Sequence, residues 1–303
     1  MTTVPCRFKR LNDNISSILN QSYNFDKLII NVDDNLTKDE YALYNSLKKL
    51  DKRIKINKSE AKWRSCNKLL PTLNLYPEDI IITVDDDIYY PIDSIKSLVE
   101  QYEKTPDCII AHEINPITIS NEEPRVNYIN GYDIKLKQME FGKYLSNCCL
   151  FPPHVFDNTD LFDYEKMMYC TNGTHDELWF WVNSTLNNVR CVGLNYVRSF
   201  APEMLEQYKE DEYALCHINS DVNTINQYML NINKLYGDKL LNNIINTPVV
   251  FNLTCDNIYS FLFLLPYIRN IYSYGCSVNV DKLTKDWKYK VLNAIKSDDK
   301  LTI

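Results

Sequence analysis

Residues 80–87 read Ile80-Ile81-Ile82-Thr83-Val84-Asp85-Asp86-Asp87. The apolar run is too short for a helix and rich in β-branched residues, so it predicts a buried strand over residues 80–84. Three carboxylates follow at once at the C-terminal end of the strand, which is where open parallel sheets bind their ligands. The segment therefore predicts both a sheet and the edge of that sheet where a site should lie.

Strand and helix signals alternate around this segment. Further apolar runs predict strands over residues 27–32, 53–56, 108–112 and 189–192. Apolar residues spaced three and four apart predict helices over residues 11–19, 38–50, 61–70, 92–102 and 176–186, the second with Thr37 as its N-cap. The polar residues up to about 132 predict a loop or a hairpin. This alternation implies a mainly parallel sheet with helices on both faces. Only residues 1–4 are available for its first strand, which suggests that the natural polypeptide extends upstream of Met1.

Composition removes several classes of function. The formal net charge of −7 argues against a general nucleic-acid binder. The ten cysteines include no C-x-x-C pair, so they predict buried free thiols in a reducing cytoplasm. The six glycines allow neither G-x-G-x-x-G nor a phosphate-binding P-loop, and G-x-S-x-G is absent, which excludes common dehydrogenases, P-loop NTPases and α/β-hydrolases. The longest apolar run, residues 259–268, has about half the length that a membrane span needs.

The three aspartates are candidates for metal binding. An extended chain would place Asp85 and Asp87 on one side and Asp86 on the other. Carboxylates this close together raise each other's pKa unless a cation lies between them. A hard divalent ion such as Mg²⁺ or Mn²⁺ supplies that cation and can bridge to a diphosphate. The alternative is a solvated acidic turn that caps the next helix, which the buried strand before the aspartates makes less favourable.

Residues 83–91 (TVDDDIYYP) resemble the DXD region of GT-A glycosyltransferases of the family 2 kind. The resemblance is closest to bacterial sugar transferases of capsule and lipopolysaccharide synthesis, including the capsular N-acetylglucosaminyltransferases. Residues 3–7 (TVPCR) with 15–21 (ISSILNQ) resemble the opening strand, turn and helix of these enzymes. Residues 147–153 (NCCLFPP) resemble their acceptor-side loop. Residues 175–179 (HDELW) resemble the acidic motif that holds their catalytic base. The resemblance covers about residues 3–200. It implies a GT-A fold, a nucleotide-sugar variant of the α/β class with a mixed, mainly parallel sheet flanked by helices.

The resemblance also implies which side chains bind the nucleotide-sugar. These are Pro5, Arg7, Asp33, Asp34, Arg64, Lys68, Asp85 and Asp86. Asp33 or Asp34 would contact the base, and Asp85 the ribose or the donor sugar. Lys68 lies where the family often has a lysine near the nucleotide, although a surface lysine is an equally good interpretation. Arg64 is a candidate phosphate partner because it lies close to Lys68 in the sequence.

The metal and the catalytic base follow from the same resemblance. Asp87 and Asp85 would ligate Mn²⁺ or Mg²⁺, and His217 would complete the shell unless it is a surface or core histidine. Asp176 and Glu177 open a helix, where the macrodipole alone favours acids. Inverting transfer nevertheless requires one carboxylate to accept the proton of the acceptor hydroxyl. Asp176 is slightly favoured over Glu177 for this role.

We predict a catalytic domain over residues 1–200, with a nucleotide-sugar half to about residue 107 and an acceptor half from about residue 108. A helical C-terminal extension, residues 201–303, should pack on it. Its strongest helix, residues 221–236, has an apolar stripe of Val222, Ile225, Tyr228, Met229, Ile232 and Leu235. The Lys-rich residues 281–296 predict a further helix, with a peripheral membrane contact as one interpretation and a solvated face as the favoured one.

The leading hypothesis is a metal-dependent, inverting glycosyltransferase of the cytoplasm or the inner membrane face. It would move a hexosyl or N-acetylhexosaminyl group from a UDP-sugar to a glycan or lipid-linked glycan in surface polysaccharide synthesis. A sugar-nucleotide nucleotidyltransferase has a similar sheet, but it needs a Gly-rich basic loop where residues 5–9 read PCRFK. A non-catalytic glycan-binding module is the third hypothesis, and the intact acids in both motifs argue against it.

Overall fold

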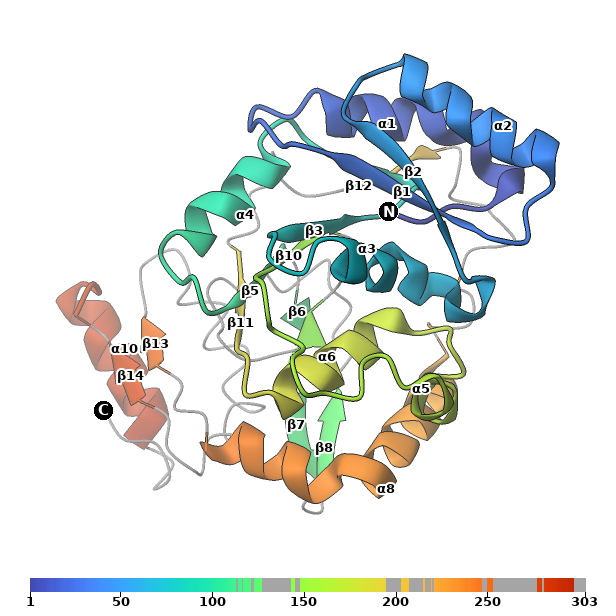
Figure 1. Ribbon diagram of the computed structural model, residues 1–303. Helices are drawn as coiled ribbons and strands as arrows, with labels where there is room; N and C mark the ends of the chain where they lie inside the picture. The colour runs from blue at the N-terminus through green and yellow to red at the C-terminus, as the bar shows by residue number, and fades with distance from the viewer. Residues whose placement is uncertain are drawn as a thin grey trace.

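The structure is a computed structural model of the chain. It describes residues 1–112, 114–115, 117–120, 123–126, 143–144, 148–194, 203–206, 215, 219, 221–246, 250–252, 277–279 and 281–296. Within these residues helices lie on both sides of a set of central strands (Figure 1). The predicted α/β class is therefore confirmed.

Strands and helices alternate through the first half of the chain. The strands are β1 Leu28–Asp33, β2 Ile54–Ser59, β3 Ile81–Val84, β4 Ile88–Tyr89, β5 Ile109–Ala111, β6 Ile114–Asn115, β7 Ile117–Ser120, β8 Glu123–Val126, β9 Lys143–Tyr144, β10 Cys148–Phe151, β11 Cys191–Gly193, β12 Glu203–Met204, β13 Val250–Asn252 and β14 Ser277–Asn279. The α-helices are α1 Leu11–Leu19, α2 Lys38–Ser46, α3 Leu70–Leu75, α4 Ser94–Tyr102, α5 Tyr164–Thr171, α6 Asp176–Leu186, α8 Val222–Asn246 and α10 Lys285–Lys296. Short 3-10 helices are η1 Pro5–Arg10, η2 Leu47–Lys49 and η3 Ala61–Lys68.

The largest sheet is mixed. Its strands follow the order β11-β5-β10-β3. β11 runs parallel to β5, whereas β10 runs antiparallel to both β5 and β3. β1 and β2 form a parallel pair, and Thr2 adds a parallel bridge to Asn31. The expected polar hairpin is present as the antiparallel pair of β7 and β8.

Residues 148–151 correct one expectation. Residues 147–153 resemble an acceptor-side loop, but the Cys-Cys-Leu-Phe run forms the inner strand β10. In this strand Cys148 lies opposite Val84, and Cys149 lies opposite both Thr83 and Ala111. All four residues of β10 are buried. An apolar run that is buried on both faces is what an inner strand of a covered sheet requires. The loop begins only after this strand.

The two faces of the sheet carry two apolar cores, because successive strand residues point to opposite faces. Cys148 and Leu150 pack in the core with residues of α1, α2 and α4. Cys149 and Phe151 pack in the other core with residues of α3, α5, α6 and α8. Figure 1 shows the first set of helices in the upper part of the molecule and α5, α6 and α8 in the lower part. Both faces of the central sheet are thus covered.

Local signals placed several helices correctly. The helices predicted over residues 11–19 and 176–186 are confirmed as α1 and α6 with the same bounds. α2 begins at Lys38, and Thr37 caps it, because the Thr37 hydroxyl accepts from the Glu40 N–H while the Glu40 carboxylate accepts from the Thr37 N–H. This reciprocal pair is the capping box that such a Thr-x-x-Glu pattern favours.

The structure does not contain the single helix that was expected over residues 61–70. Residues 61–68 form η3, which is interrupted at Arg64 (φ 50°, ψ −125°). α3 begins at Leu70 and has Pro71 in its first turn. Proline lacks an N–H and has a fixed φ, so it suits the start of a helix, where no intrahelical partner is needed. Pro71 therefore begins a helix instead of ending one.

Helix α8 packs on the side of the sheet that carries α5 and α6. It runs on beyond residue 236 to Asn246. Its buried apolar residues are Ile225, Tyr228, Met229, Ile232, Leu240 and Ile244, which share one core with residues of α5 and α6. Leu235 was expected in this stripe, but its side chain is 45% exposed, and the neighbouring Tyr236 packs against the core at this turn.

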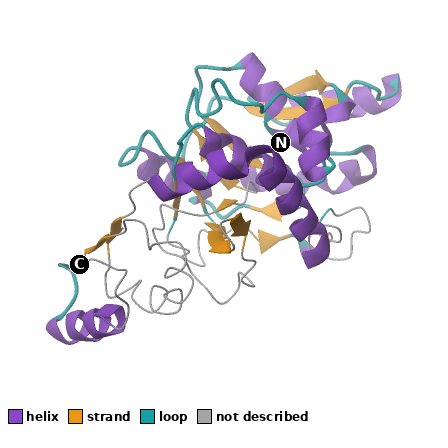
Figure 2. Cartoon of the chain, turned by 90° about the horizontal axis from the view of Figure 1, so that it is seen from below, coloured by secondary structure: helices purple, strands orange, loops and turns teal. Residues whose placement is uncertain are grey.

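Other expectations concern the periphery and the thiols. α10 confirms a helix within the Lys-rich residues 281–296, and both views place it at the edge of the molecule (Figures 1 and 2).

Of the seven cysteines in the described part of the chain, all are free thiols and six are buried, as expected. Among the described residues no helix is both long and apolar enough to cross a membrane.

Candidate active site

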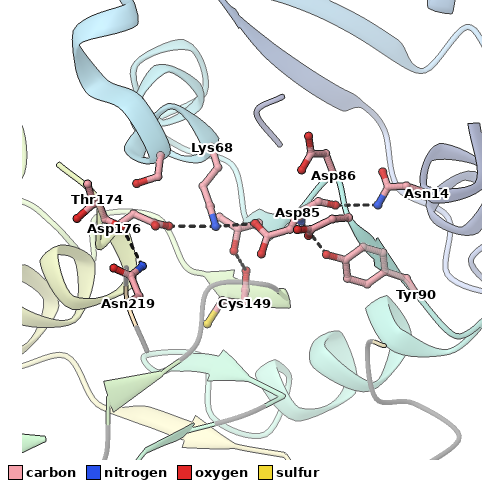
Figure 3. A network of polar contacts seen from close by, with 12 residues as sticks. Asn14, Lys68, Asp85, Asp86, Tyr90, Cys149, Thr174, Asp176 and Asn219 are labelled. Carbon is pink, nitrogen blue, oxygen red and sulfur yellow. Dashed lines mark hydrogen bonds and ion pairs between the residues drawn. The ribbon is translucent and has the colours of Figure 1, made fainter. Parts of the chain in front are cut away.

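The three aspartates after β3 lie in a tight turn between β3 and β4. Buried Asn14 of α1 donates from Nδ2 to the carbonyl oxygens of Asp85 (2.7 Å) and Ile88 (2.8 Å). The Asp85 N–H donates to the hydroxyl of Tyr90 at 2.7 Å. Figure 3 shows Asn14 and Tyr90 on the same side of Asp85, opposite Lys68. Side chains that are themselves buried therefore fix the backbone of the acidic turn.

Two cations meet the three aspartates. Arg7 Nη1 lies 2.6 Å from Asp86 Oδ1 and 3.7 Å from Asp87 Oδ2. Lys68 Nζ lies 2.5 Å from Asp85 Oδ1. The expected alternation assumed an extended chain, but the chain turns after Val84, and Asp86 and Asp87 lie in that turn. Asp86 and Asp87 share one cation, and Asp85 contacts the other.

Lys68 joins the two acidic motifs. Its Nζ also lies 3.0 Å from Oδ2 of Asp176, the first residue of α6 (Figure 3). The lysine is buried, which decides against the surface interpretation. Burial lowers the pKa of Lys68, but Asp176, Asp85 and Glu177 together raise that pKa well above its ordinary range. A buried, charged lysine thus connects the DXD turn with the second acidic pair.

The carboxylates of the turn are poorly solvated. Burial, followed by repulsion from Asp85 and Asp86, raises the pKa of Asp87 to about 7, although Arg7 and Lys68 oppose the change. Burial also raises the pKa of Asp85, against the lowering effect of Lys68. The site therefore holds more negative charge than Arg7 and Lys68 compensate. A further cation would reduce the repulsion between the carboxylates.

This part of the turn fits a divalent metal ion. The Asp86 Oδ2 atom is buried and has no hydrogen-bond partner among the described residues. Within the described part of the chain no three Asp, Glu, His or Cys side chains form a ready-made metal cage. Magnesium is commonly bound by one or two carboxylates together with substrate phosphates and water. Asp87, with Asp85 or Asp86, matches that kind of site. His217, the third expected ligand, lies outside the described residues.

The expected nucleotide contacts lie along neighbouring strand ends. Asp33 ends β1, and its carboxylate accepts from Asn67 Nδ2 at 3.1 Å. Burial raises the pKa of Asp33, which the Asn67 hydrogen bond partly offsets. Asp34 is exposed and accepts from the Ala61 N–H at 3.2 Å. Pro5, at the start of η1, is exposed.

Arg64 contacts a different part of the site from the one expected. Its Nη1 donates to the carbonyl of Asn172 at 2.9 Å, at the C-terminal end of α5. The neighbouring Ser65 hydroxyl donates to the carbonyl of Gly173 at 3.4 Å. These contacts support the turn that leads into Asp176, so Arg64 is engaged with the second acidic motif and its position does not favour a phosphate contact.

The second acidic pair begins α6. Asp176 is buried and Glu177 is partly buried. Both lie in the first helical turn, where the positive end of the macrodipole favours carboxylates. Trp179 and Trp181, on the same helix, are buried in the apolar core.

Sequence reasoning missed the side chains of α1 that hold the acidic turn. Beside Asn14, the Ser17 hydroxyl accepts from the Tyr90 N–H at 3.2 Å, and Gln21 Nε2 donates to the carbonyls of Tyr90 (3.1 Å) and Pro91 (2.8 Å). The available signal was the spacing of Asn14 and Ser17, which places them on one side of α1 next to its buried apolar residues, with Gln21 just after the end of the helix. A polar row on the buried side of a helix predicts internal hydrogen bonds.

A mixed sheet covered by helices, with acids at the end of β3 and a second acidic pair on α6 joined to them by Lys68, is the arrangement expected of a GT-A glycosyltransferase. The family described as Glycosyl transferase family 2 matches residues 4–154, and the chain belongs to that family. Its members use nucleotide-sugar donors and acceptor substrates. The matched residues include Arg7, Lys68 and the three aspartates, whereas Asp176 and Glu177 lie beyond them. No curated protein matches the sequence.

Proposed function

We propose that this glycosyltransferase is metal-dependent and inverting, and that it transfers a hexosyl or N-acetylhexosaminyl group from a UDP-sugar to a hydroxyl of a glycan or lipid-linked glycan. Synthesis of a surface polysaccharide is the process that the sequence resemblance favours. One observation carries the proposal. Lys68 contacts Asp85 of the DXD turn and Asp176 of the second motif at the same time, so the donor and base residues share one buried site.

The donor is proposed to lie along the strand ends. Asp33 or Asp34, at the end of β1, would bind the uracil base, and Arg7 would line the nucleotide pocket. Asp85 would contact the ribose or the sugar. Lys68 and Arg7 are the cations nearest the acidic turn among the described residues, and they suit a diphosphate that enters beside it.

The metal is proposed to be Mn²⁺ or Mg²⁺, held by Asp87 with Asp85 or Asp86. When bound, such an ion neutralises the negative charge of a nucleoside diphosphate leaving group. The excess of carboxylates over cations in the turn and the raised pKa of Asp87 support this assignment. Arg7, which contacts both Asp86 and Asp87, would hold these carboxylates in place while the ion is absent.

The chemical step needs a base on the acceptor side. The acceptor oxygen forms a bond to the anomeric carbon, and the bond from that carbon to the diphosphate oxygen breaks, so UDP leaves with the bonding electrons. The proton of the acceptor hydroxyl passes to a carboxylate. We assign this role to Asp176, with Glu177 as the alternative, because Asp176 is the acid that Lys68 holds next to the donor turn.

A panel of nucleotides and nucleotide sugars tests the donor class. Thermal unfolding would be followed with UDP, GDP, UDP-glucose, UDP-galactose, UDP-N-acetylglucosamine and UDP-N-acetylgalactosamine, each with Mn²⁺ and each with EDTA. We expect stabilisation by uridine ligands only with Mn²⁺, since a ligand that binds only the folded state raises its stability. Equal stabilisation by GDP and UDP would contradict the UDP assignment.

Peripheral membrane contact through α10 is a separate proposal. Lys285 and Lys290 are exposed on α10, Lys282 is exposed just before it, and Tyr289 is 69% exposed. Exposed lysines beside an aromatic side chain suit an anionic lipid surface. Co-sedimentation with vesicles of phosphatidylglycerol, compared with phosphatidylcholine vesicles, tests it. Absence of binding to both would identify this helix as an ordinary solvated face.

A further inference from the structure

The turn that leads into Asp176 is held from outside by a chain segment that lies beyond the family match. Residues 172–175 connect α5 to α6. On one side they receive the hydrogen bonds from η3 described above. On the other side, Asn219 Nδ2 donates to the carbonyl of Thr174 at 2.9 Å (Figure 3). The hydroxyl of Tyr228, in α8, lies 2.8 Å from Oγ1 of the same threonine.

The direction of the Tyr228 hydrogen bond follows from proton counting. The Thr174 hydroxyl donates its single proton to the carbonyl of Thr171 at 3.1 Å. A hydroxyl has one donor and two acceptor positions, so with its proton on the Thr171 carbonyl Thr174 Oγ1 accepts from Tyr228, although the pair alone would allow either hydroxyl to donate. Both side chains are buried, and water does not compete for this bond. Thr174 thus receives one hydrogen bond on its side chain and one on its backbone, both from the C-terminal extension.

We propose that Tyr228, with Asn219, is a positioning residue for the base pair at the start of α6. The inference rests on the proposed function, because it takes Asp176 or Glu177 as the acceptor-side base. Only one residue separates Thr174 from Asp176, so a displacement of Thr174 moves the start of α6. The extension therefore takes part in orienting the base, in addition to covering the apolar core.

The expected effect is on the chemical step. A misplacement of about 1 Å can cost about a hundredfold in rate even when substrate binding is intact. The proposed donor site consists of Asp85, Asp87 and Lys68, whereas the Tyr228 hydroxyl bonds to Thr174. Loss of the Tyr228 hydroxyl should therefore lower kcat and leave the KM for the donor unchanged.

Tyr228→Phe removes the hydroxyl and keeps the ring, and Tyr236→Phe is its matched control. Tyr236 lies about two turns further along α8, and its hydroxyl donates to Asp160 Oδ2 at 2.8 Å, away from the base turn. Both variants of the full chain would be assayed by UDP release from the UDP-sugar of the panel that the unaltered protein turns over fastest. We expect kcat to fall about tenfold to a hundredfold for Tyr228→Phe and by less than about twofold for Tyr236→Phe.

Thr174 provides the conservative rescue. Thr174→Ser keeps the hydroxyl and should retain most of kcat, whereas Thr174→Val loses it and should behave as Tyr228→Phe does. Equal kcat values for Tyr228→Phe, Tyr236→Phe and the unaltered chain would overturn the positioning role and leave the proposed function intact.

Hydrogen–deuterium exchange separates this result from failure of the proposed function. The backbone amides of residues 174–178 should exchange faster in Tyr228→Phe than in Tyr236→Phe, with or without turnover. If the unaltered chain releases no UDP from any donor of the panel, the proposed function fails. Even in that case the exchange rates test the positioning role. Equal exchange at residues 174–178 in the two variants would overturn it.

Discussion

The side-chain nitrogen of Lys68 lies 3.0 Å from Oδ2 of Asp176, and the lysine that makes this contact comes from the end of η3, far from α6 in the sequence. The same nitrogen contacts Asp85 at 2.5 Å. One buried cation therefore links a carboxylate of the proposed donor site to the proposed base. Any change in the position of Lys68 must affect both motifs.

Removal of the Lys68 charge should destabilise the protein and stop transfer. Lys68→Met leaves Asp85 and Asp176 without their shared cation, and breaking a buried ion pair from one side typically costs about 3–5 kcal/mol. We expect a loss near the lower end, about 3 kcal/mol, because Asp85 is still about one quarter exposed. Urea unfolding measures it.

Lys62→Met is the control for this substitution. Lys62 pairs with Glu60 at 2.7 Å, but both side chains are exposed, so solvent screens the contact. The control should unfold at nearly the same urea concentration as the unaltered chain. If Lys68→Met were as stable as Lys62→Met, the buried bridge would contribute nothing to the fold.

Two glycines should respond to alanine with opposite signs. Gly173 has φ +65°, and an added Cβ would lie 3.1 Å from both Arg64 Cδ and Met168 Sδ. Gly173→Ala should therefore lower the free energy of unfolding by about 1–3 kcal/mol, the usual cost of a left-handed non-glycine residue. Gly237 lies within α8, where the nearest contact of an added Cβ is Asn233 Cβ at 3.7 Å. Gly237→Ala should raise that free energy by roughly 0.5–1 kcal/mol, because alanine favours the helix.

Calorimetric or chemical unfolding of both glycine variants gives the test. The base turn should also be disturbed in Gly173→Ala, so UDP release should fall in that variant alone. A Gly173→Ala protein as stable and as active as Gly237→Ala would show that the turn tolerates a side chain.

Substitution of the base should separate chemistry from binding. Asp176→Asn, or Glu177→Gln if that residue is the base, should slow transfer by roughly two to four orders of magnitude, the usual contribution of a general base. Isothermal titration with UDP and Mn²⁺ should give nearly unchanged affinity. Near-native transfer rates in both variants would place the base elsewhere in the protein, or indicate a retaining reaction.

The buried His112 should make the fold sensitive to acid. Burial lowers the pKa of His112 from 6.5 to about 4, and its Nε2 lies 3.1 Å from the Ser94 carbonyl. Between these two pH values the unfolded chain binds the proton and the folded chain does not. Stability should therefore fall as the pH decreases from about 6.5 to about 4, by at most about 1.4 kcal/mol per pH unit from this group.

His112→Gln keeps a donor for the Ser94 carbonyl and removes the titrating group. Its urea midpoint should vary less between pH 6.5 and pH 4 than the midpoint of the unaltered chain. Identical pH profiles would mean that His112 is solvated or protonated in the folded protein.

Local patterns predicted most of the first half of the fold. The apolar spacing within α1 and α6 gave their bounds, and the short β-branched run before Asp85 gave β3. The predictions that failed concern segments whose secondary structure is decided by tertiary packing. Residues 148–151 resembled a loop beside two prolines, but the sheet uses them as an inner strand. The helix predicted over residues 61–70 would stop before Pro71, although proline is equally suited to a helix start.

The candidate site was predictable as a list of acids but not as an arrangement. Asp85, Asp87 and Asp176 stood out because of the motifs around them. The shared contact of Lys68 and the support of Thr174 by Tyr228 could not be predicted, because each joins segments that are distant in the chain and only packing brings them together. Asn14 and Ser17 were missed, although their spacing beside the buried apolar residues of α1 was an available signal.

Metal-dependent donor use is the central claim, and Asp87 is the residue that tests it most directly. UDP release from the preferred UDP-sugar would be measured with excess Mn²⁺, with excess EDTA, and for Asp87→Asn with excess Mn²⁺. We predict that EDTA abolishes release and that renewed Mn²⁺ restores it. Asp87→Asn should remain folded by circular dichroism and should be inactive even with Mn²⁺. Unchanged turnover in excess EDTA, together with full activity of Asp87→Asn, would contradict the assignment of the acidic turn as a metal and donor site.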